Sequence, residues 1–182
     1  MKKERFEAIT DAVLAIIITL MILEIKIPEL TINNISNVLQ HILIYALSFT
    51  YIAILWLNHH HIFVSVKIVH INLVWINFGL LFCTSLLPLA TEHISNNVHE
   101  IANHILFGSI MAVTTFLYTI IEKIVMIETK EKRAKKINLR NWISVIMFLI
   151  SIPLSFVSIY LSGFIFIVVP LMYFLISKRS LV

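Results

Sequence analysis

The sequence is short of glycine, cysteine and charge, and each shortage excludes a class of protein. Three glycines among 182 residues cannot build the TVGYG-type loop of backbone carbonyls that forms the familiar ion-selective filters. The single cysteine, Cys83, lies in an apolar run, which excludes an internal disulfide and a cysteine metal site. Charged residues make up only 13% of the chain and hydrophobic residues 59%, a composition typical of membrane proteins.

Residue sets that carry catalysis or voltage sensing are absent from the sequence as well. It contains no HExxH spacing, no serine elbow and no paired carboxylates, and no apolar run carries spaced arginines. The basic residues behind the net charge of +4 cluster at the ends of apolar runs, where a membrane explains them better than a nucleic acid does. We therefore expect no enzymatic activity, no bound cofactor and no nucleic-acid partner.

Six apolar runs can each be assigned to a membrane-spanning helix, for which about 20 residues are needed. The sixth run is short and contains Pro170, but the stretch from Trp142 to Ile176 is too long for one crossing, so Ser162-Gly163 is interpreted as a turn. The sequence thus predicts an all-α integral membrane protein with one six-helix domain over residues 1–182. Its predicted spans are 6–23, 35–57, 68–90, 101–121, 142–161 and 164–177.

Lys and Arg residues predict the orientation of these spans, because they accumulate on the cytoplasmic side. With the N-terminus inside, all of the 14 Lys and Arg residues except Lys26 fall on inner segments. Most lie in the charged linker 122–140, which we expect to continue the fourth helix out of the membrane. Both termini are therefore predicted to be cytoplasmic, in the cell membrane of a prokaryote.

The first span is unusual because it carries a carboxylate inside an apolar run. Asp11 follows Arg5 and Glu7 and precedes a continuous aliphatic stretch. An acidic residue at the centre of a span costs about 2.5–3.5 kcal/mol, and less near the interface. We therefore expect this helix to lie among other helices, with a partner for Asp11.

Apolar residues recur along one face of the same helix. Ile16, Thr19, Leu20 and Leu23 have the spacing i, i+3, i+4 and i+7, so they share one face of the helix. Ile16, at the inner end of this face, lies about 140° around the helix axis from Asp11. On spacing alone, this stripe is more typical of ordinary packing between helices. It is also compatible with the lining of an ion path whose only hydroxyl is that of Thr19. Glu24, one turn beyond Leu20, can sit at an outer mouth or be a simple interfacial residue near Lys26.

Polar residues in the next two spans are candidate partners for the first helix. Trp56 and His59 share a helix face near the cytoplasmic side, and Asn77 lies deeper in the third span, where a buried amide requires a partner. His59, His60 and His61 point about 100° apart on a helix, so they cannot all bind one metal ion. The pattern therefore indicates a polar network that closes a helical bundle, and it argues against a metal site.

The start of the first span resembles a family signature. Arg5, followed three residues later by Ile9-Thr10-Asp11, is similar to the RxxxFSD motif of the endolysosomal potassium channel family and its prokaryotic relatives. Ile9 replaces Phe, which removes an aromatic contact, and Thr10 replaces Ser, which keeps the hydroxyl.

Two further matches follow in the order that this family has them. Trp56-x-x-His59-x-x-x-Phe63 resembles its second-span signature, and Asn77 with Leu87-Pro88 eleven residues later resembles its third span. The first half of the chain is matched closely and the second half by topology only.

The resemblance implies a potassium-permeable, weakly selective cation channel that is a homotetramer of six-helix subunits. It implies a central pore lined by the first helix, with bulky aliphatic residues at the constriction and K⁺ as the permeant ion. By position the constriction is assigned to Ile16, Leu20 and Leu23, with Thr19 beside them. The residues expected to hold the pore helices in place are Arg5, Asp11, Trp56, His59 and Asn77.

Two other functions stay open at this stage. A secondary transporter would need a polar substrate site near the midplane, preferably on a pair of broken helices. Pro88, Pro153 and Pro170 permit kinks, but no matching pair appears in the sequence. A membrane-embedded metal enzyme would rest on the histidine run alone.

Overall fold

The computed structural model describes residues 2–64, 66, 68–129 and 134–177, with no side chains described at 134–137 or 174–177. These residues form α-helices, one 3₁₀ turn and short connections, without a strand, which confirms the predicted all-α class. The elements in chain order are α1 (Lys3–Glu24), η1 (Ile32–Asn34), α2 (Ile35–Phe63), α3 (Ile71–Ser85), α4 (Leu87–Asn96), α5 (Ile101–Thr129), α6 (Ala134–Val157) and α7 (Ile159–Ser177).

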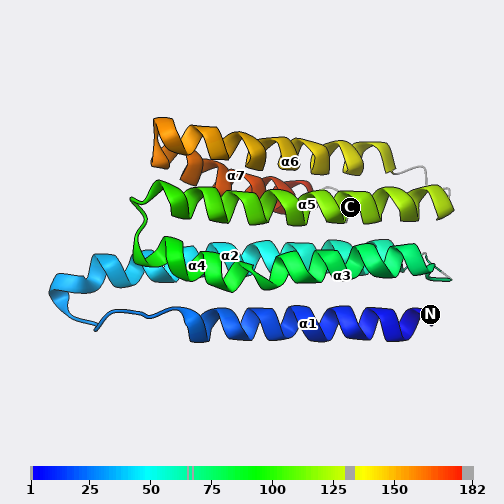
Figure 1. The fold of residues 1–182 in the computed structure, drawn as a ribbon, viewed down its shortest axis with the longest axis horizontal. Coiled ribbons are helices and arrows are strands. Elements are labelled where there is room, and N and C mark those ends of the chain that lie inside the picture. The colour runs from blue at the N-terminus through cyan, green and yellow to red at the C-terminus, as the bar shows by residue number, and fades with distance from the viewer. Residues whose placement is uncertain (1, 65, 67, 130–133, 178–182) are drawn as a thin grey trace.

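The helices lie side by side in a bundle, with α1 at one edge and α6 and α7 at the other (Figure 1). α1 packs on α2, α3 and α4, while α5 packs on α3, α4 and α6. The start of α1 and the ends of α2 and α5 lie at one end of the bundle, here called the N-terminal end. The opposite end, where α2 and α7 begin, is called the far end.

Most of these helices have the length and composition of membrane spans. Among the described residues, five segments are long and apolar enough to cross a bilayer, and a sixth apolar helix, Ile159–Tyr173, is shorter. The five segments are Lys3–Glu24, Ile32–Phe63, Ile71–Asn96, Ile101–Thr129 and Asn138–Val157. Their order along the chain follows that of the predicted spans, although several boundaries differ.

Two helices extend beyond their predicted spans because packing continues past the apolar run. α2 was expected to span 35–57, but it continues through the histidines to Phe63, and both His59 and Phe63 are buried. α5 continues past residue 121 to Thr129, with Glu122 and Val125 buried on one face. The predicted helical continuation into the charged linker is thus confirmed up to Thr129, and residues 130–133 lie outside the described part.

The third predicted span, 68–90, is two helices in the structure. α3 ends at Ser85 and α4 begins at Leu87, with Leu86 as the junction and Pro88 in the first turn of α4. Proline is tolerated in a first turn because its missing N–H would have no helical acceptor there. α4 then continues to Asn96, beyond the predicted end of the span.

The predicted turn at Ser162-Gly163 is wrong, because both residues lie inside α7. The chain reverses at Ser158 between α6 and α7. Ser162 is buried, with its Oγ 3.2 Å from His104 Nδ1 of α5, and a Cβ at Gly163 would meet the same ring at 4.0 Å. Ser162 therefore packs α7 against α5, and neither residue forms a turn.

Candidate functional site

The first helix has one covered side and one uncovered side. Its buried side chains recur every three or four residues and face α2, α3 and α4. These residues are Phe6, Thr10, Leu14, Ile17 and Met21. No other helix of the described subunit lies beyond α1, because α1 forms the edge of the bundle (Figure 1).

The four residues predicted to line an ion path all lie on the uncovered side. The exposed fractions of Ile16, Leu20 and Leu23 are 56%, 44% and 77%, and Thr19 is exposed as well. Thr19 Oγ1 donates a hydrogen bond to the carbonyl oxygen of Ile16 at 2.8 Å, so its hydroxyl proton is used within the helix. Its oxygen lone pairs are left to face outward. Glu24, the last residue of α1, is also exposed.

A chain of buried hydrogen bonds joins the covered side of α1 to α2 and α3. His59 Nε2 lies 3.0 Å from Asn77 Oδ1 and must donate, because an amide oxygen only accepts. Asn77 Nδ2 donates to Thr10 Oγ1 at 2.9 Å, and Thr10 Oγ1 donates to the carbonyl oxygen of Phe6 at 3.1 Å. Every donor in this chain is satisfied, which buried polar groups require.

Aromatic rings enclose the histidine of this chain. The His59 ring lies 4.5 Å from the Phe63 ring and 6.0 Å from the Phe6 ring, centroid to centroid, at small interplanar angles. His59, Phe6 and Phe63 are all at most 2% exposed. The spacing of His59 and Phe63 therefore corresponds to a stack against α1, and Thr10, noted in the sequence only as a substitution, is the point of attachment on α1.

Asp11 contacts the second helix separately from this chain. Its Oδ1 accepts a hydrogen bond from Trp56 Nε1 at 2.8 Å. The Trp56 ring in turn stacks on His60, with centroids 5.9 Å apart. His59 and His60 thus point to different partners, and no group of three or more His, Cys, Asp or Glu with metal-site geometry occurs among the described residues.

Arg5 does not take part in the network within the subunit. It is exposed and forms no hydrogen bond or ion pair with the described residues. The expectation that Arg5 acts through Trp56, His59 or Asn77 is therefore not met in one chain. The physical reason is its direction, because eleven residues of helix place Arg5 about 20° from Ile16, on the uncovered side of α1.

We expect the Asp11–Trp56 bond to stabilise the contact between α1 and α2 by about 1 kcal/mol. Hydrogen bonds to charged groups contribute about 1.5–3 kcal/mol, but those between membrane helices average only about 0.6 and reach about 1.7. Asp11→Ala, Trp56→Phe and the double variant form a cycle that isolates this term in thermal unfolding in detergent. Trp75→Phe, at an exposed tryptophan of α3, is the control, and strictly additive effects would contradict the prediction.

A second buried polar cluster joins α5, α6 and α7 toward the N-terminal end of the bundle, and the sequence did not reveal it. Glu122 is fully buried and its Oε2 accepts from Asn141 Nδ2 at 2.8 Å. Asn141 Oδ1 accepts from the Tyr173 hydroxyl at 2.7 Å, and the Arg140 guanidinium carbon lies 4.2 Å from the centre of the Tyr173 ring. The Asn141 side chain therefore links Glu122 of α5 to Tyr173 of α7.

Glu122 was assigned to the charged linker because it is the first charge after an apolar run. A helical signal was nevertheless present, because Tyr118 and Val125 flank it at i−4 and i+3 on one face, and both are buried. Its other oxygen, Oε1, has no hydrogen-bond partner among the described residues.

Glu122→Ala is expected to lower the free energy of unfolding by about 2–4 kcal/mol, because it opens a cavity and leaves the Asn141 amide without an acceptor. Glu122→Gln keeps the shape and one carbonyl oxygen, so it should lose less than half as much. Thermal unfolding in detergent measures both, with Glu128→Ala at an exposed position of α5 as the control. Equal losses for Ala and Gln would show that shape and the amide contact contribute little.

Comparisons with known proteins find relatives among potassium channels. Residues 5–88 match the family model described as Endosomal/lysosomal potassium channel TMEM175. A potassium channel of Chryseobacterium sp. is 37% identical over 185 residues, covering 98% of this chain and 96% of that protein. A potassium channel of Chamaesiphon minutus is 33% identical over 121 residues, covering 60% of this chain and 59% of that protein.

The fold matches over nearly the whole chain. The crystal structure of a lysosomal potassium-selective channel TMEM175 homolog from Chamaesiphon minutus has a TM-score of 0.82 and 26% sequence identity, covering 96% of this chain and 97% of that one. The Chryseobacterium relative and this crystal structure each match almost the whole chain, so the similarity extends beyond the residues of the motifs. The chain belongs to the TMEM175 family of potassium channels.

Proposed function

We propose that the chain forms a potassium-permeable, weakly selective cation channel, assembled as a homotetramer around a pore lined by α1. The observation that carries this proposal is the uncovered side of α1, which presents Ile16, Thr19, Leu20 and Leu23 away from the rest of the subunit. A ring of copies that turn this side toward a common axis would bury the aliphatic stripe and enclose a path along it.

The constriction is assigned to the aliphatic side chains of this stripe. Rings of Ile16, Leu20 and Leu23 offer no hydrogen bond to water, so they restrict ions by dewetting. An ion that passes must lose part of its hydration shell, which K⁺ does more readily than the smaller Na⁺. Thr19 offers hydroxyl oxygens as a partial replacement, which favours weak rather than strict selectivity.

The covered side of α1 has the complementary role of holding the pore helix in position. Asp11, Trp56, His59 and Asn77 attach α1 to α2 and α3 from the side opposite the proposed axis. Arg5, on the uncovered side, is available to a neighbouring copy. These residues therefore support the pore without contacting the ions.

The proposed topology has both termini in the cytoplasm of a prokaryotic cell. The start of α1, the end of α5 and the start of α6 lie at one end of the bundle. Lys and Arg, which prefer the cytoplasmic side, are frequent in the sequence at these points. Glu24 then lies at the external end of the pore, in a multi-pass protein of the cell membrane.

Recording from purified protein in planar bilayers tests the proposal. We expect discrete current steps carried by monovalent cations, with a reversal potential that favours K⁺ modestly over Na⁺. A secondary transporter would produce no resolved steps, because its turnover needs a conformational cycle for each substrate. Light scattering of the same preparation should give the mass of a tetramer, and a monomer that conducts would overturn the assignment of the pore to α1.

Glu24→Gln should lower conductance mainly at low ionic strength. Carboxylates at the outer mouth concentrate cations through a field whose range falls from about 30 Å at 0.01 M salt to about 3 Å at 1 M. Glu29→Gln, at an exposed position in the connection after α1, is the matched control. An equal loss of conductance at all salt concentrations would assign Glu24 a structural role.

A further inference from the structure

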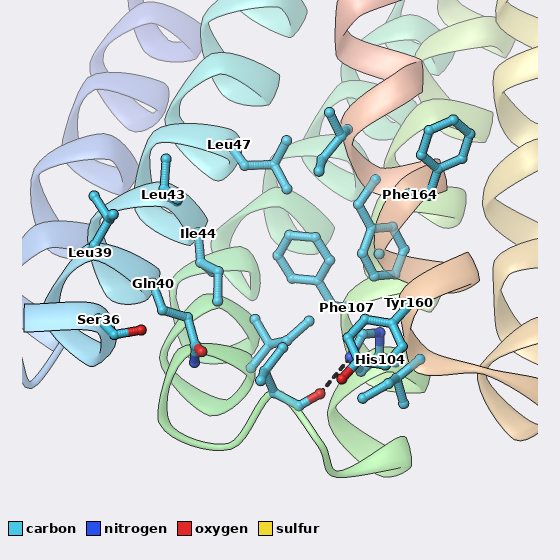
Figure 2. A pocket seen from close by; sticks show the side chains of 16 residues that line it. Ser36, Leu39, Gln40, Leu43, Ile44, Leu47, His104, Phe107, Tyr160 and Phe164 are labelled. Atoms are coloured by element: carbon cyan, nitrogen blue, oxygen red, sulfur yellow. Dashed lines mark hydrogen bonds between the residues drawn. The ribbon is translucent and has the colours of Figure 1, made fainter.

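A pocket of about 570 Å³ lies toward the far end of the bundle, between α2, α4, α5 and α7 (Figure 2). Its size falls within the range of about 300–1,000 Å³ that is usual for sites of small organic ligands. Leu43, Ile44 and Leu47 of α2 form one wall, and Phe164 and Ile167 of α7 form part of the other.

The pocket has a closed floor and an open side. The floor includes Ile94, Phe107 and Phe166, which are at most 4% exposed. The rim residues Leu43 and Phe164, by contrast, are 60% and 64% exposed. The opening therefore faces sideways between α2 and α7, toward the surroundings of the bundle.

Two polar side chains along the walls, His104 and Gln40, already have partners within the protein. His104 Nε2 lies 2.8 Å from the carbonyl oxygen of Val98, and its Nδ1 lies 3.2 Å from Ser162 Oγ. Gln40 Nε2 donates to the carbonyl oxygen of Ser95 at 3.3 Å. The remaining surface is mostly hydrocarbon, so the site suits neither an ion nor a chain of ordered water molecules.

We infer that this pocket binds the acyl chain of a membrane lipid. The apolar walls continue into the exposed apolar surface of α2, a candidate membrane span, and of α7, a shorter apolar helix that packs on α2. An empty space of this size would forfeit dispersion contacts along all its walls, and acyl chains are the apolar molecules that a bilayer supplies at its open side. Ser36 and Gln40, at the start of α2, lie where the polar end of the lipid would emerge.

A glycine in the wall allows the pocket to be filled by mutation. A Cβ built on Gly163 meets only His104 Cε1 within 4 Å, at 4.0 Å, so a larger side chain has room to enter the pocket. Gly163→Ala and Gly163→Leu make a graded series. Gly79 of α3 is the matched control, because its Cβ would likewise meet only Leu117 Cδ1, at 3.9 Å, and it does not line the pocket.

The test uses vesicles of phosphatidylcholine that include phosphatidylcholine with a photoreactive diazirine on one acyl chain. After illumination, mass spectrometry maps the labelled residues of the full-length protein. We expect labelling at Leu43, Leu47, Phe164 and Ile167 to exceed that at Phe156 and Phe82, exposed aromatic residues elsewhere on the surface, by several-fold. Gly163→Leu should reduce the pocket labelling several-fold, Gly163→Ala less, and Gly79→Leu not at all.

Two results would overturn the inference. Labelling spread evenly over all exposed apolar residues, or unchanged by Gly163→Leu in a protein whose melting temperature is retained, would show no preferred site. A disulfide that joins Leu43→Cys of one copy to Phe164→Cys of another copy, in a Cys83→Ser background, would show that a second copy covers the opening. If Gly163→Leu fails to fold, Gly163→Ala and the distribution of labels in the unmodified protein decide.

Discussion

Ile16→Asn should convert the proposed pore into a leak and lower its discrimination between K⁺ and Na⁺ several-fold. An asparagine ring places amide groups where the isoleucines exclude water, so the constriction becomes wet and ions retain more of their hydration. Bilayer recording under a K⁺/Na⁺ gradient measures both effects. The leak is a rise in open probability, and the loss of discrimination is a shift of the reversal potential toward the value of a nonselective pore.

The same helix offers a control for this experiment. Ile22 is 42% exposed but lies about 120° from Ile16 around the helix, so Ile22→Asn introduces the same polarity away from the proposed axis. We expect its conductance and selectivity to stay close to those of the unmodified protein. Similar leaks from both variants would indicate a general loosening of the bundle.

Accessibility provides an independent check of the constriction. A bulky thiol reagent should block current through Ile16→Cys in a Cys83→Ser background, whereas Thr19→Val should reduce the preference for K⁺ without opening the pore. If the reagent modifies the cysteine fully and the current does not change, α1 does not line the path and the pore assignment is wrong.

Asn77→Ala should cause the largest loss of stability among single changes in the hydrogen-bond network, about 2–3 kcal/mol. The substitution removes the acceptor of His59 and the donor to Thr10, and both side chains are at most 2% exposed. A hydrogen bond between membrane helices contributes about 0.6 kcal/mol on average. Leaving a buried polar group without a partner costs about 1–3 kcal/mol, so the unpaired N–H of His59 dominates the effect, while Thr10 keeps its bond to the carbonyl oxygen of Phe6.

Thermal unfolding in detergent measures this loss, and Asn72→Ala is the control because Asn72 is an exposed amide on the same helix. Thr10→Val should cost less in the Asn77→Ala background than alone, because the bond between these two side chains is then already lost. Equal stability of Asn77→Ala and Asn72→Ala would show that packing, and not this chain of bonds, holds α1 against α3.

The sequence alone was sufficient for the helical class, the order of the spans and most of the network. Apolar runs of sufficient length have few alternatives to helices in a membrane, because every backbone N–H and C=O must be satisfied within the segment. The same solvent makes polar residues conspicuous: Asp11, His59 and Asn77 each needed a partner, and the structure provides one for each within the subunit.

Helix ends depended on contacts that no single segment contains. α2 and α5 continue past their apolar runs because His59, Phe63 and Glu122 pack against other helices. Ser162 and Gly163 have the composition of a turn, yet they lie within α7, where the small side chain of Ser162 contacts His104. A local pattern cannot distinguish a small residue that allows a turn from one that allows close packing.

The direction of individual side chains was decided only by the tertiary structure. Arg5 and Asp11 are close in sequence, but Arg5 points away from the subunit and Asp11 toward Trp56. The Glu122 cluster and the pocket between α2 and α7 each combine residues from three or more helices. Periodicity determines which residues share a face of one helix, whereas the neighbour that covers this face is determined by packing among all the helices.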